Sequence, residues 1–303
     1  MKRSVLAISV LLAGVTVAQE PDWSKVEVKV VPVAGGVSML VGQGGNIGVT
    51  TGKDGTFLID DQFAQLLPKI KAAVKTLGDQ PIRFVVNTHF HGDHTGSNAP
   101  LGEAGVVIVA QDNVRKRLGL ERVDRDTKEK IPPKPPSAWP IITFGESVAF
   151  HLNGDDVDVI HVATAHTDGD AIIKFQKANV IHMGDTFFNG MYPFIDVDSG
   201  GSIDGIIAAA DKGLSLSDAG TKIIPGHGPL GTKADLQKYR DVLAGVRDRV
   251  KALVAQGKTL EQVSAAKPTA QWDATWGKGF MKPDMFVSFV YRSLTEKKAA
   301  GPR

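Results

Sequence analysis

The chain has 303 residues, of which 42% are hydrophobic and 22% charged, and it carries a formal net charge of +2 and no cysteine. This composition is typical of a globular protein with a large core, and so mild a charge does not favour a nucleic-acid partner. Without cysteine there is no disulfide, and no thiolate to act as nucleophile or metal ligand. Any metal ion must therefore be held by histidine and carboxylate side chains.

The first twenty residues differ from the rest. A basic pair at 2–3 precedes an apolar run over 5–17, and small residues occupy the −3 and −1 positions of the bond after Ala18. This pattern is typical of a secretory signal peptide over residues 1–18. The apolar run is shorter than the ~20 residues that cross a bilayer, and no cysteine follows it for lipid attachment. We therefore expect a periplasmic or secreted protein without a membrane anchor.

The next part of the chain is predicted to consist mainly of β-strands. Val26, Val28 and Val30 alternate with charged residues, and the apolar runs that follow are separated by glycine-rich turns. Apolar residues then recur at helical spacing, which predicts an amphipathic helix over 63–77. Further strands are predicted at 37–41, 47–51, 56–60, 82–86 and 106–110, and a further helix is expected to begin at 113.

Residues 121–140 are charged and then rich in proline. Proline lacks an N–H donor and fixes φ, so this segment is predicted to be a surface loop rather than a regular element. A loop of this length inside a compact domain is often a lid or a wall of a substrate site.

The second half of the chain repeats the order of strands, helix and strand. Two such units predict an α/β fold in which two sheets lie face to face with helices outside. The domain is expected to span 19–231, with a helical C-terminal segment over 232–303 packed on it. The predicted strands are 147–152, 157–162, 171–176, 179–184 and 221–224, and the predicted helices are 203–216, 236–254, 260–265 and 285–294.

The clearest chemical signal lies at 89–94, where the predicted strand 82–86 ends. His89 and His91 are two residues apart, so on an extended backbone their side chains point the same way. Asp93 and His94 follow on a turn that we expect Gly92 to open. So dense a group of imidazole and carboxylate side chains predicts a metal site, and these ligands suit Zn²⁺.

Further ligands must come from other strand ends, because one segment cannot surround two metal ions. His166, Asp185 and His227 each follow a predicted strand, and glycines beside the last two allow close approach of the backbone. The other histidines lie in or beside predicted strands and are interpreted as ordinary core or surface imidazoles; they are His151, His161 and His182.

The sequence resembles the metallo-β-lactamase superfamily through its His-x-His-x-Asp-His segment and the later histidine, aspartate and Pro-Gly-His segments in the same order. The resemblance spans roughly residues 26–230. It implies a four-layer αββα sandwich with a metal groove along one edge, and it implies that Asp60 orients the histidine segment without binding metal. It further implies two zinc ions per chain, one held by His89, His91 and His166, the other by Asp93, His94 and His227, with Asp185 between them.

Such a site implies a hydrolase of small acyl compounds. Two zinc ions lower the pKa of a bridging water enough to supply hydroxide near neutral pH. That hydroxide would attack a carbonyl polarised by one metal and break a C–N, C–O or C–S acyl bond. Asp93 is the expected catalytic residue, because it could orient the hydroxide and carry its proton.

Export favours β-lactam hydrolysis, and with it a part in antibiotic resistance. The alternative is an exported thioesterase or lactonase of the glyoxalase II type, because Asp185 stands in a Gly-Asp-Thr segment similar to theirs. The β-lactamase subclass with a cysteine ligand has cysteine at that place, and lysine where this chain has Phe188. The apolar segment 187–194 would either line a substrate pocket or pack beneath the groove. A zinc-binding protein without catalytic activity is the other class of function kept open.

Overall fold

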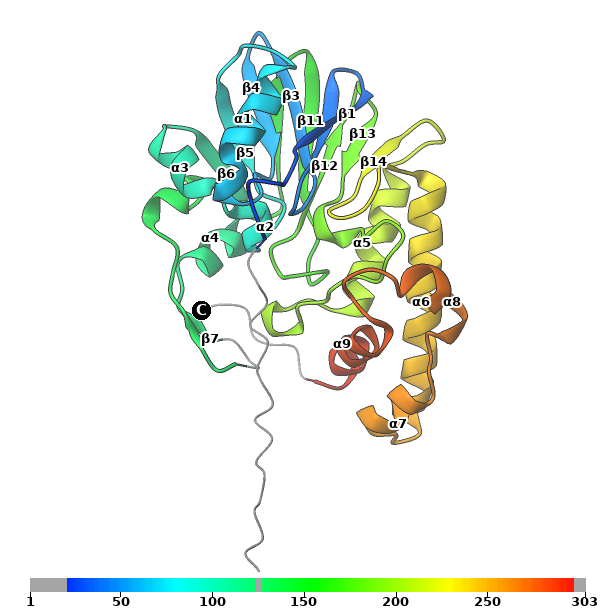
Figure 1. Cartoon of the computed structure of the whole chain (residues 1–303). Helices are drawn as coiled ribbons and strands as arrows, with labels where there is room; N and C mark the ends of the chain where they lie inside the picture. The colour runs from blue at the N-terminus through cyan, green and yellow to red at the C-terminus, as the bar shows by residue number, and fades with distance from the viewer. Residues whose placement is uncertain (1–20, 124–126, 297–303) are drawn as a thin grey trace, which may run out of the picture.

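The computed structural model describes residues 21–123 and 127–296, and it places two β-sheets between helices (Figure 1). The predicted signal peptide lies outside the described residues. Within them, no helix is both long and apolar enough to cross a bilayer.

The first sheet has seven strands in the order β1-β2-β3-β4-β5-β6-β9. Strands β1 to β4 pair antiparallel, and β4, β5, β6 and β9 pair in parallel. The carboxyl ends of parallel strands meet at one edge of a sheet, where sites are usually built. Asp60 follows β4 and the histidine segment follows β5, so both lie at this edge. The strands are β1 (Lys29–Ala34), β2 (Val37–Val41), β3 (Ile47–Gly52), β4 (Gly55–Ile59), β5 (Ile82–Val86), β6 (Val107–Gln111) and β9 (Ile142–Phe144).

The second sheet has six strands in the order β10-β11-β12-β13-β14-β15, and only β13 and β14 pair in parallel. Asp185 follows β13, His227 follows β14, and His166 stands in the connection between β11 and β12. The strands are β10 (Ser147–Leu152), β11 (Asp155–His161), β12 (Ala171–Phe175), β13 (Val180–His182), β14 (Lys222–Ile224) and β15 (Gly231–Thr232).

The core consists of layers set by the alternation of side chains along the strands. Phe57 of the first sheet and Phe175 of the second meet between the sheets, with ring centroids 6.4 Å apart. Within β12, Ile173 faces that same cluster, whereas Ile172 faces the helices on the other side. The outer faces are covered by η1 (Ala64–Leu66) and α1 (Leu67–Lys75) on the first sheet, and by α5 (Ile203–Ser215) and α6 (Lys233–Ala255) on the second. The expected αββα sandwich is thus confirmed.

Four helices end the described chain, and two of them, α6 and α9, pack on α5 (Figure 1). Helix α6 begins three residues before the predicted start because Thr232 caps it: its hydroxyl and the Asp235 carboxylate form a reciprocal capping box. Val287 and Val290 of the last helix join the cluster that α5 and α6 form. After α6 come α7 (Leu260–Ala265), α8 (Ala270–Trp276) and α9 (Pro283–Thr295).

The segment 121–140 is not the irregular loop that its prolines predicted. Its strands β7 (Arg122–Val123) and β8 (Lys130–Ile131) pair antiparallel, and η2 (Pro136–Ala138) follows. Elements of two or three residues are too short for periodicity to show in a sequence. The remaining helices are α2 (Gly92–Thr95), α3 (Asn98–Glu103), α4 (Asp112–Leu118), η3 (Gly184–Thr186) and η4 (Val197–Ser199).

Candidate metal centre

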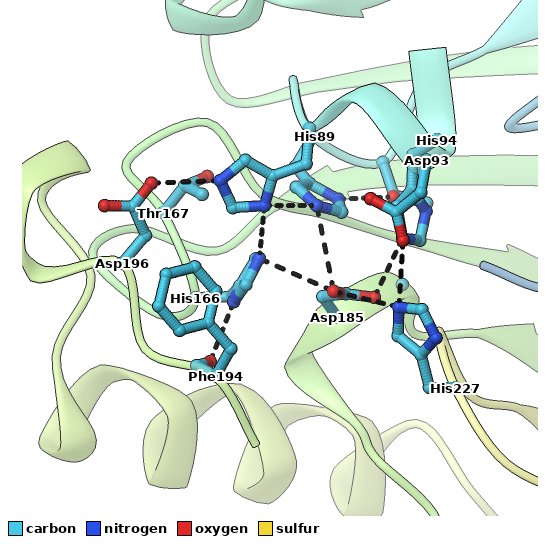
Figure 2. A network of polar contacts seen from close by, with 12 residues as sticks. His89, Asp93, His94, His166, Thr167, Asp185, Phe194, Asp196 and His227 are labelled. Atoms are coloured by element: carbon cyan, nitrogen blue, oxygen red, sulfur yellow. Dashed lines mark hydrogen bonds and ion pairs between the residues drawn. The ribbon is translucent and has the colours of Figure 1, made fainter. Parts of the chain in front are cut away.

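The seven side chains predicted to bind metal come together at one edge of the sandwich (Figure 2). The first sheet contributes the histidine segment, part of which forms the short helix α2, and the second sheet contributes the residues after its strands. Gly92 begins α2 rather than an open turn, so this detail of the prediction was wrong. The side chains fall into two groups, one of His89, His91, His166 and Asp185, the other of Asp93, His94 and His227.

The first group is formed mainly by imidazoles that point at one another. His91 Nδ1 lies 3.1 Å from His89 Nε2 and 2.9 Å from His166 Nε2. Asp185 Oδ2 lies 3.5 Å from His166 Nε2. Three ring nitrogens and a carboxylate oxygen around one point are a donor set that suits a tetrahedral metal ion such as Zn²⁺.

The second group surrounds Asp93. Its Oδ2 lies 3.3 Å from His227 Nε2 and 3.5 Å from His94 Nε2. Asp185 faces this group too, with Oδ1 at 3.1 Å from His94 Nε2 and Oδ2 at 3.4 Å from His227 Nε2. Asp185 therefore contacts both groups, as the resemblance implied for a residue between two metals.

Two buried atoms at the centre lack the partners that burial demands. His94 Nε2 and Asp185 Oδ1 make no hydrogen bond within the described residues, although both are sealed from solvent. A buried polar atom without a partner costs free energy, and a divalent cation between an imidazole nitrogen and a carboxylate oxygen would satisfy both. The residues present thus fit a metal pair.

The surroundings hold several of these groups in the protonation state that binds metal. Burial lowers the pKa of His89 well below its usual value and that of His166 to about 4, so both imidazoles are neutral at pH 7. Burial opposes ionisation of Asp93, but the charge of His94 and the hydrogen bond and charge of His227 together outweigh it and lower the pKa of Asp93 to about 2. Neutral imidazole and ionised carboxylate are the ligand forms that a metal ion needs. Burial opposes protonation of His94 and His227, but Asp185 and Asp93 outweigh it and raise the pKa of His94 well above its usual value and that of His227 to about 9, so metal binding there must displace a proton.

Asp60 lies behind the histidines, as predicted, and contacts them without joining either group. Its Oδ2 accepts a hydrogen bond from His94 Nδ1 at 2.7 Å, and its Oδ1 accepts one from the Thr88 N–H at 2.7 Å. The residue has φ = 63°, a left-handed conformation uncommon for a residue other than glycine and typical of strained functional sites. These contacts fix the orientation of the His94 ring.

Asp196 has a similar role that the sequence did not reveal. Its Oδ2 accepts a hydrogen bond from His91 Nε2 at 2.9 Å, and the Phe194 carbonyl likewise accepts from His166 Nδ1 at 2.9 Å. Burial opposes ionisation of Asp196, but the bond from His91 lowers its pKa well below the usual value. Asp196 lies 105 residues after His91, and no local pattern links the two.

The other histidines lie outside the two groups, as interpreted from the sequence. His182 is buried, with Nε2 donating to the Asn46 carbonyl at 3.0 Å and Nδ1 accepting from the Gly184 N–H. His161 Nδ1 donates to the Asp170 carbonyl. The remaining one, His151, lies on the surface and pairs with Asp156.

The apolar segment 187–194 serves both purposes that the sequence left open. Phe187 and Tyr192 are buried in the core next to α6 and α8. Phe188 stacks on His227 with ring centroids 5.2 Å apart, and Phe194 lies 5.6 Å from His166. The segment therefore packs the core on one side and supports two candidate ligands on the other.

Two cavities flank the centre. One of about 670 Å³ begins at His91 and is bounded by Arg122 of β7 and by Phe289 of α9. The other, of about 740 Å³, begins at His227 and is bounded mainly by apolar side chains such as Met191 and Phe280. A substrate placed over the two groups could extend into either cavity.

Comparison with known proteins agrees with this architecture. The model of the metallo-beta-lactamase superfamily matches residues 40–229. A hydroxyacylglutathione hydrolase from a Polaromonas species is 28% identical over 162 residues, which are 52% of this chain and 53% of that protein. The chain thus spans about half the length of this relative.

Solved structures share the fold at low sequence identity. A metallo-beta-lactamase from Pontibacter korlensis superposes with a TM-score of 0.56 at 17% identity, covering 72% of this chain and 99% of that one. A stereoselective inverting sec-alkylsulfatase from a Pseudomonas species gives a TM-score of 0.65 at 18% identity, covering 88% of this chain and 50% of that one. Since the family model covers well over half of the sequence and the fold agrees with it, the chain belongs to the metallo-beta-lactamase superfamily.

Proposed function

We propose that this metallo-hydrolase binds two zinc ions and hydrolyses the acyl bond of a small substrate. The observation that supports the proposal most is the position of Asp185, whose carboxylate contacts both groups: Oδ1 faces His94, and Oδ2 lies between His166 and His227. A single metal site would have no use for such a shared carboxylate. The first ion would be held by His89, His91 and His166, the second by Asp93, His94 and His227, with Asp185 reaching both.

Bound in this way, the two ions would lower the pKa of water and polarise an acyl oxygen. The chain itself supplies orientation and proton transfer. Asp60 and Asp196 fix the rings of His94 and His91 through their far nitrogens. Asp93 is more exposed than Asp185, with 28% of its side chain accessible against 6%, so its Oδ2 can exchange a proton with a substrate.

β-Lactams are the substrate class that we propose first, because the chain shares its fold with metallo-β-lactamases over almost their whole length. Thioesters are the second candidate. The curated relative is a hydroxyacylglutathione hydrolase, and the aspartate between the two groups is a feature of that branch by resemblance. Either bond is broken by the same attack on an acyl carbon.

Activity of the purified, zinc-loaded protein on four substrates tests this proposal. Nitrocefin, a carbapenem, a homoserine lactone and a thioester would be compared before and after chelation. Zinc-dependent turnover of a β-lactam supports the first candidate, and turnover of the thioester alone supports the second. No turnover of any of them, with two zinc ions bound, would contradict the enzymatic proposal.

His91→Ala tests the centre itself. The variant removes the ligand atom common to the contacts with His89 and His166, so we expect loss of at least one zinc ion and of nearly all activity. Zinc content by mass spectrometry and turnover are measured together. His151→Ala, at an exposed imidazole outside the groups, is the matched control and should change neither.

We also propose a periplasmic or secreted location, supported by the signal-peptide pattern of residues 1–18. Expression of the full chain in a Gram-negative host, followed by fractionation and N-terminal sequencing, tests it. A mature protein that begins near residue 19 in the periplasm or medium is the expected result. An intact N-terminus in the cytoplasm would contradict it.

A further inference from the structure

The cavity beside His91 contains an arginine whose charge the described chain leaves unpaired. Arg122 stands on β7, and its guanidinium lies over the ring of Phe90, 4.8 Å from the centroid. Its side chain is partly buried, and among the residues that the structure describes no carboxylate forms an ion pair with it. A partly buried guanidinium held only by an aromatic ring is an uncommon arrangement.

The other two arginines of this cavity are already neutralised. Arg117 donates two hydrogen bonds to the Asp168 carboxylate, at 2.6 and 2.7 Å. Arg292 donates to Asp198 at 2.7 Å and to Glu296 at 2.9 Å. Among the residues that the structure describes, Arg122 is thus the arginine of this cavity that forms no ion pair.

The electrostatic environment of Arg122 favours an anion. Burial lowers the pKa of its guanidinium, and the nearby charge of Arg117 lowers it further, while Asp196 acts in the opposite direction. Asp196 forms no ion pair or hydrogen bond with Arg122, and its two oxygens accept hydrogen bonds from His91 Nε2 and the Ser199 N–H instead. A carboxylate of a bound ligand would pair with the Arg122 guanidinium and so offset the free-energy cost of its partial burial.

Arg122 is also close enough to the metal centre to act on a substrate there. The Arg122 guanidinium lies over the Phe90 ring, whose centroid is 4.5 Å from that of the His91 ring. A single aromatic ring therefore separates this guanidinium from the candidate metal ligand His91. The cavity at the opposite end of the centre is bounded by apolar side chains such as Met191 and Phe280. The two ends of the groove thus differ in polarity.

We propose that Arg122 binds a carboxylate of the substrate, so that the enzyme selects anionic acyl compounds whose charged end lies on the His91 side. The proposal rests on the proposed hydrolase function and narrows its substrate class. The planar guanidinium fits a carboxylate through two parallel hydrogen bonds, and stacking on Phe90 holds it in place. A neutral substrate would leave the Arg122 guanidinium without an ion pair, as in the described part of the free protein.

A matched pair of esters tests this selection in the zinc-loaded enzyme. The 4-nitrophenyl monoester of adipic acid carries a free carboxylate, and its methyl ester does not. We expect Arg122→Gln to lower kcat/KM for the anionic ester about 10- to 100-fold, mainly through KM, and to change that for the methyl ester less than about 3-fold. Arg122→Lys should recover part of the loss, because lysine keeps the charge but not the planar fork.

Arg83→Gln is the control variant. Arg83 also lies over an aromatic ring, 5.4 Å from the centroid of Phe84, but at the opposite end of β5 from the histidine segment. This variant loses the same charge and the same kind of contact, so it should leave the ratio of kcat/KM for the two esters unchanged. The proposal would be overturned if Arg122→Gln lowered kcat/KM equally for both esters, or if Arg83→Gln changed the ratio of the two kcat/KM values as much as Arg122→Gln does.

A binding measurement separates this proposal from the proposed function. Isothermal titration with 4-phenylbutane-1-sulfonate uses an anion that binds metals weakly, and 4-phenylbutan-1-ol is its neutral counterpart. We expect the sulfonate to bind the wild type about 10-fold more tightly than Arg122→Gln and the alcohol to bind both equally. If no ester is hydrolysed but the sulfonate discriminates, the hydrolase function fails and the anion site stands. Equal binding of the sulfonate to both proteins overturns the site.

Discussion

Asp196 shows how much the centre depends on a residue that does not belong to either group. It holds His91 through Nε2 while the opposite nitrogen, Nδ1, faces the candidate metal position. Partners of this kind fix ring orientation, and their loss typically weakens metal binding about 10- to 100-fold. We expect Asp196→Ala to weaken zinc binding by that amount, measured by competition with a chelating dye.

The conservative variant distinguishes orientation from a general structural effect. Asp196→Asn keeps an oxygen that accepts from His91 and should recover part of the lost affinity. Asp198→Ala changes an exposed carboxylate in η4, the short helix that Asp196 caps, and should leave zinc affinity unchanged. Equal losses in the alanine and asparagine variants would contradict an orienting role.

Asp196 differs from the predicted site residues in a way that shows which residues the sequence alone could not reveal. Four members of the two groups lie within 89–94, so their spacing along one strand end already predicts a shared target. Asp185 and His227 lie far along the chain, but the strand end and the glycines beside them made them recognisable. Asp196 has no such context, because its meeting with His91 depends on the path of the whole loop after η3.

Asp170 gives the stability of the protein a predictable pH dependence. Its carboxylate is buried and accepts hydrogen bonds from the Thr167 hydroxyl and N–H, at 2.6 and 2.8 Å. Burial raises its pKa to about 8, whereas in an unfolded chain it would be about 3.9. The folded state therefore holds this proton more tightly, so its contribution to stability is complete below about pH 4 and is lost as the pH rises to about 8.

Denaturant unfolding between pH 5 and 9, with chelator present to exclude metal binding, measures this effect. For Asp170 alone the free energy of unfolding should fall by up to about 1.4 kcal/mol per pH unit below pH 8. Asp170→Asn has no proton to release, so its curve should be flatter than that of the wild type over this range. Parallel curves for the two proteins would show that Asp170 does not titrate in this way.

At the scale of the elements, the turn after β14 requires a glycine. A Cβ atom at Gly226 would lie 2.0 Å from Asp185 Oδ1 and 2.6 Å from the Gly184 carbonyl carbon. Neither neighbour can yield, because Gly184 is backbone and Asp185 contacts both groups. We expect Gly226→Ala to displace Asp185 or His227, and so to lower the bound zinc to one ion or fewer and reduce hydrolysis at least 100-fold.

Gly92→Ala is an informative control because Gly92 lies between two candidate ligands, His91 and Asp93. A Cβ atom there would meet nothing within 4 Å, and Gly92 begins α2 without a left-handed backbone. This variant should retain both zinc ions by mass spectrometry. Full zinc content in Gly226→Ala, or its loss in Gly92→Ala, would contradict the packing argument.

The length of an element largely decided whether the sequence predicted it. Most strands of the two sheets and the helices α1, α5 and α6 were predicted to within a few positions, because their apolar runs or periods show in the sequence. The hairpin of β7 and β8, the strands β9 and β15 and the helices α3 and α8 were not predicted. These strands have two or three residues each and α3 has six. Helix α8 buries only Trp276, so no apolar stripe marks it.

At the scale of the whole molecule, the centre joins the two halves of the sandwich. Each group combines ligands after the first sheet with ligands from the second: His89 and His91 with His166, and His94 with His227. Zinc that binds only the folded arrangement stabilises it by about 2.7 kcal/mol per site when free zinc is 100 times Kd. Because the unfolded chain separates these ligands, the metal acts as a link between the sheets.

Removal of zinc should therefore lower the melting temperature of the protein by about 5–10 °C per site. Calorimetry of the zinc-loaded protein with and without excess EDTA measures the shift. Asp185→Asn should reduce it more than a variant at any other ligand, since the Asp185 carboxylate lies within ion-pair distance of imidazoles of both groups, whereas His151→Ala should leave it unchanged. An ion held by ligands from both sheets must stabilise the folded state, because only that state brings the ligands together. An identical melting temperature with and without EDTA would therefore mean that metal binding does not connect the two halves.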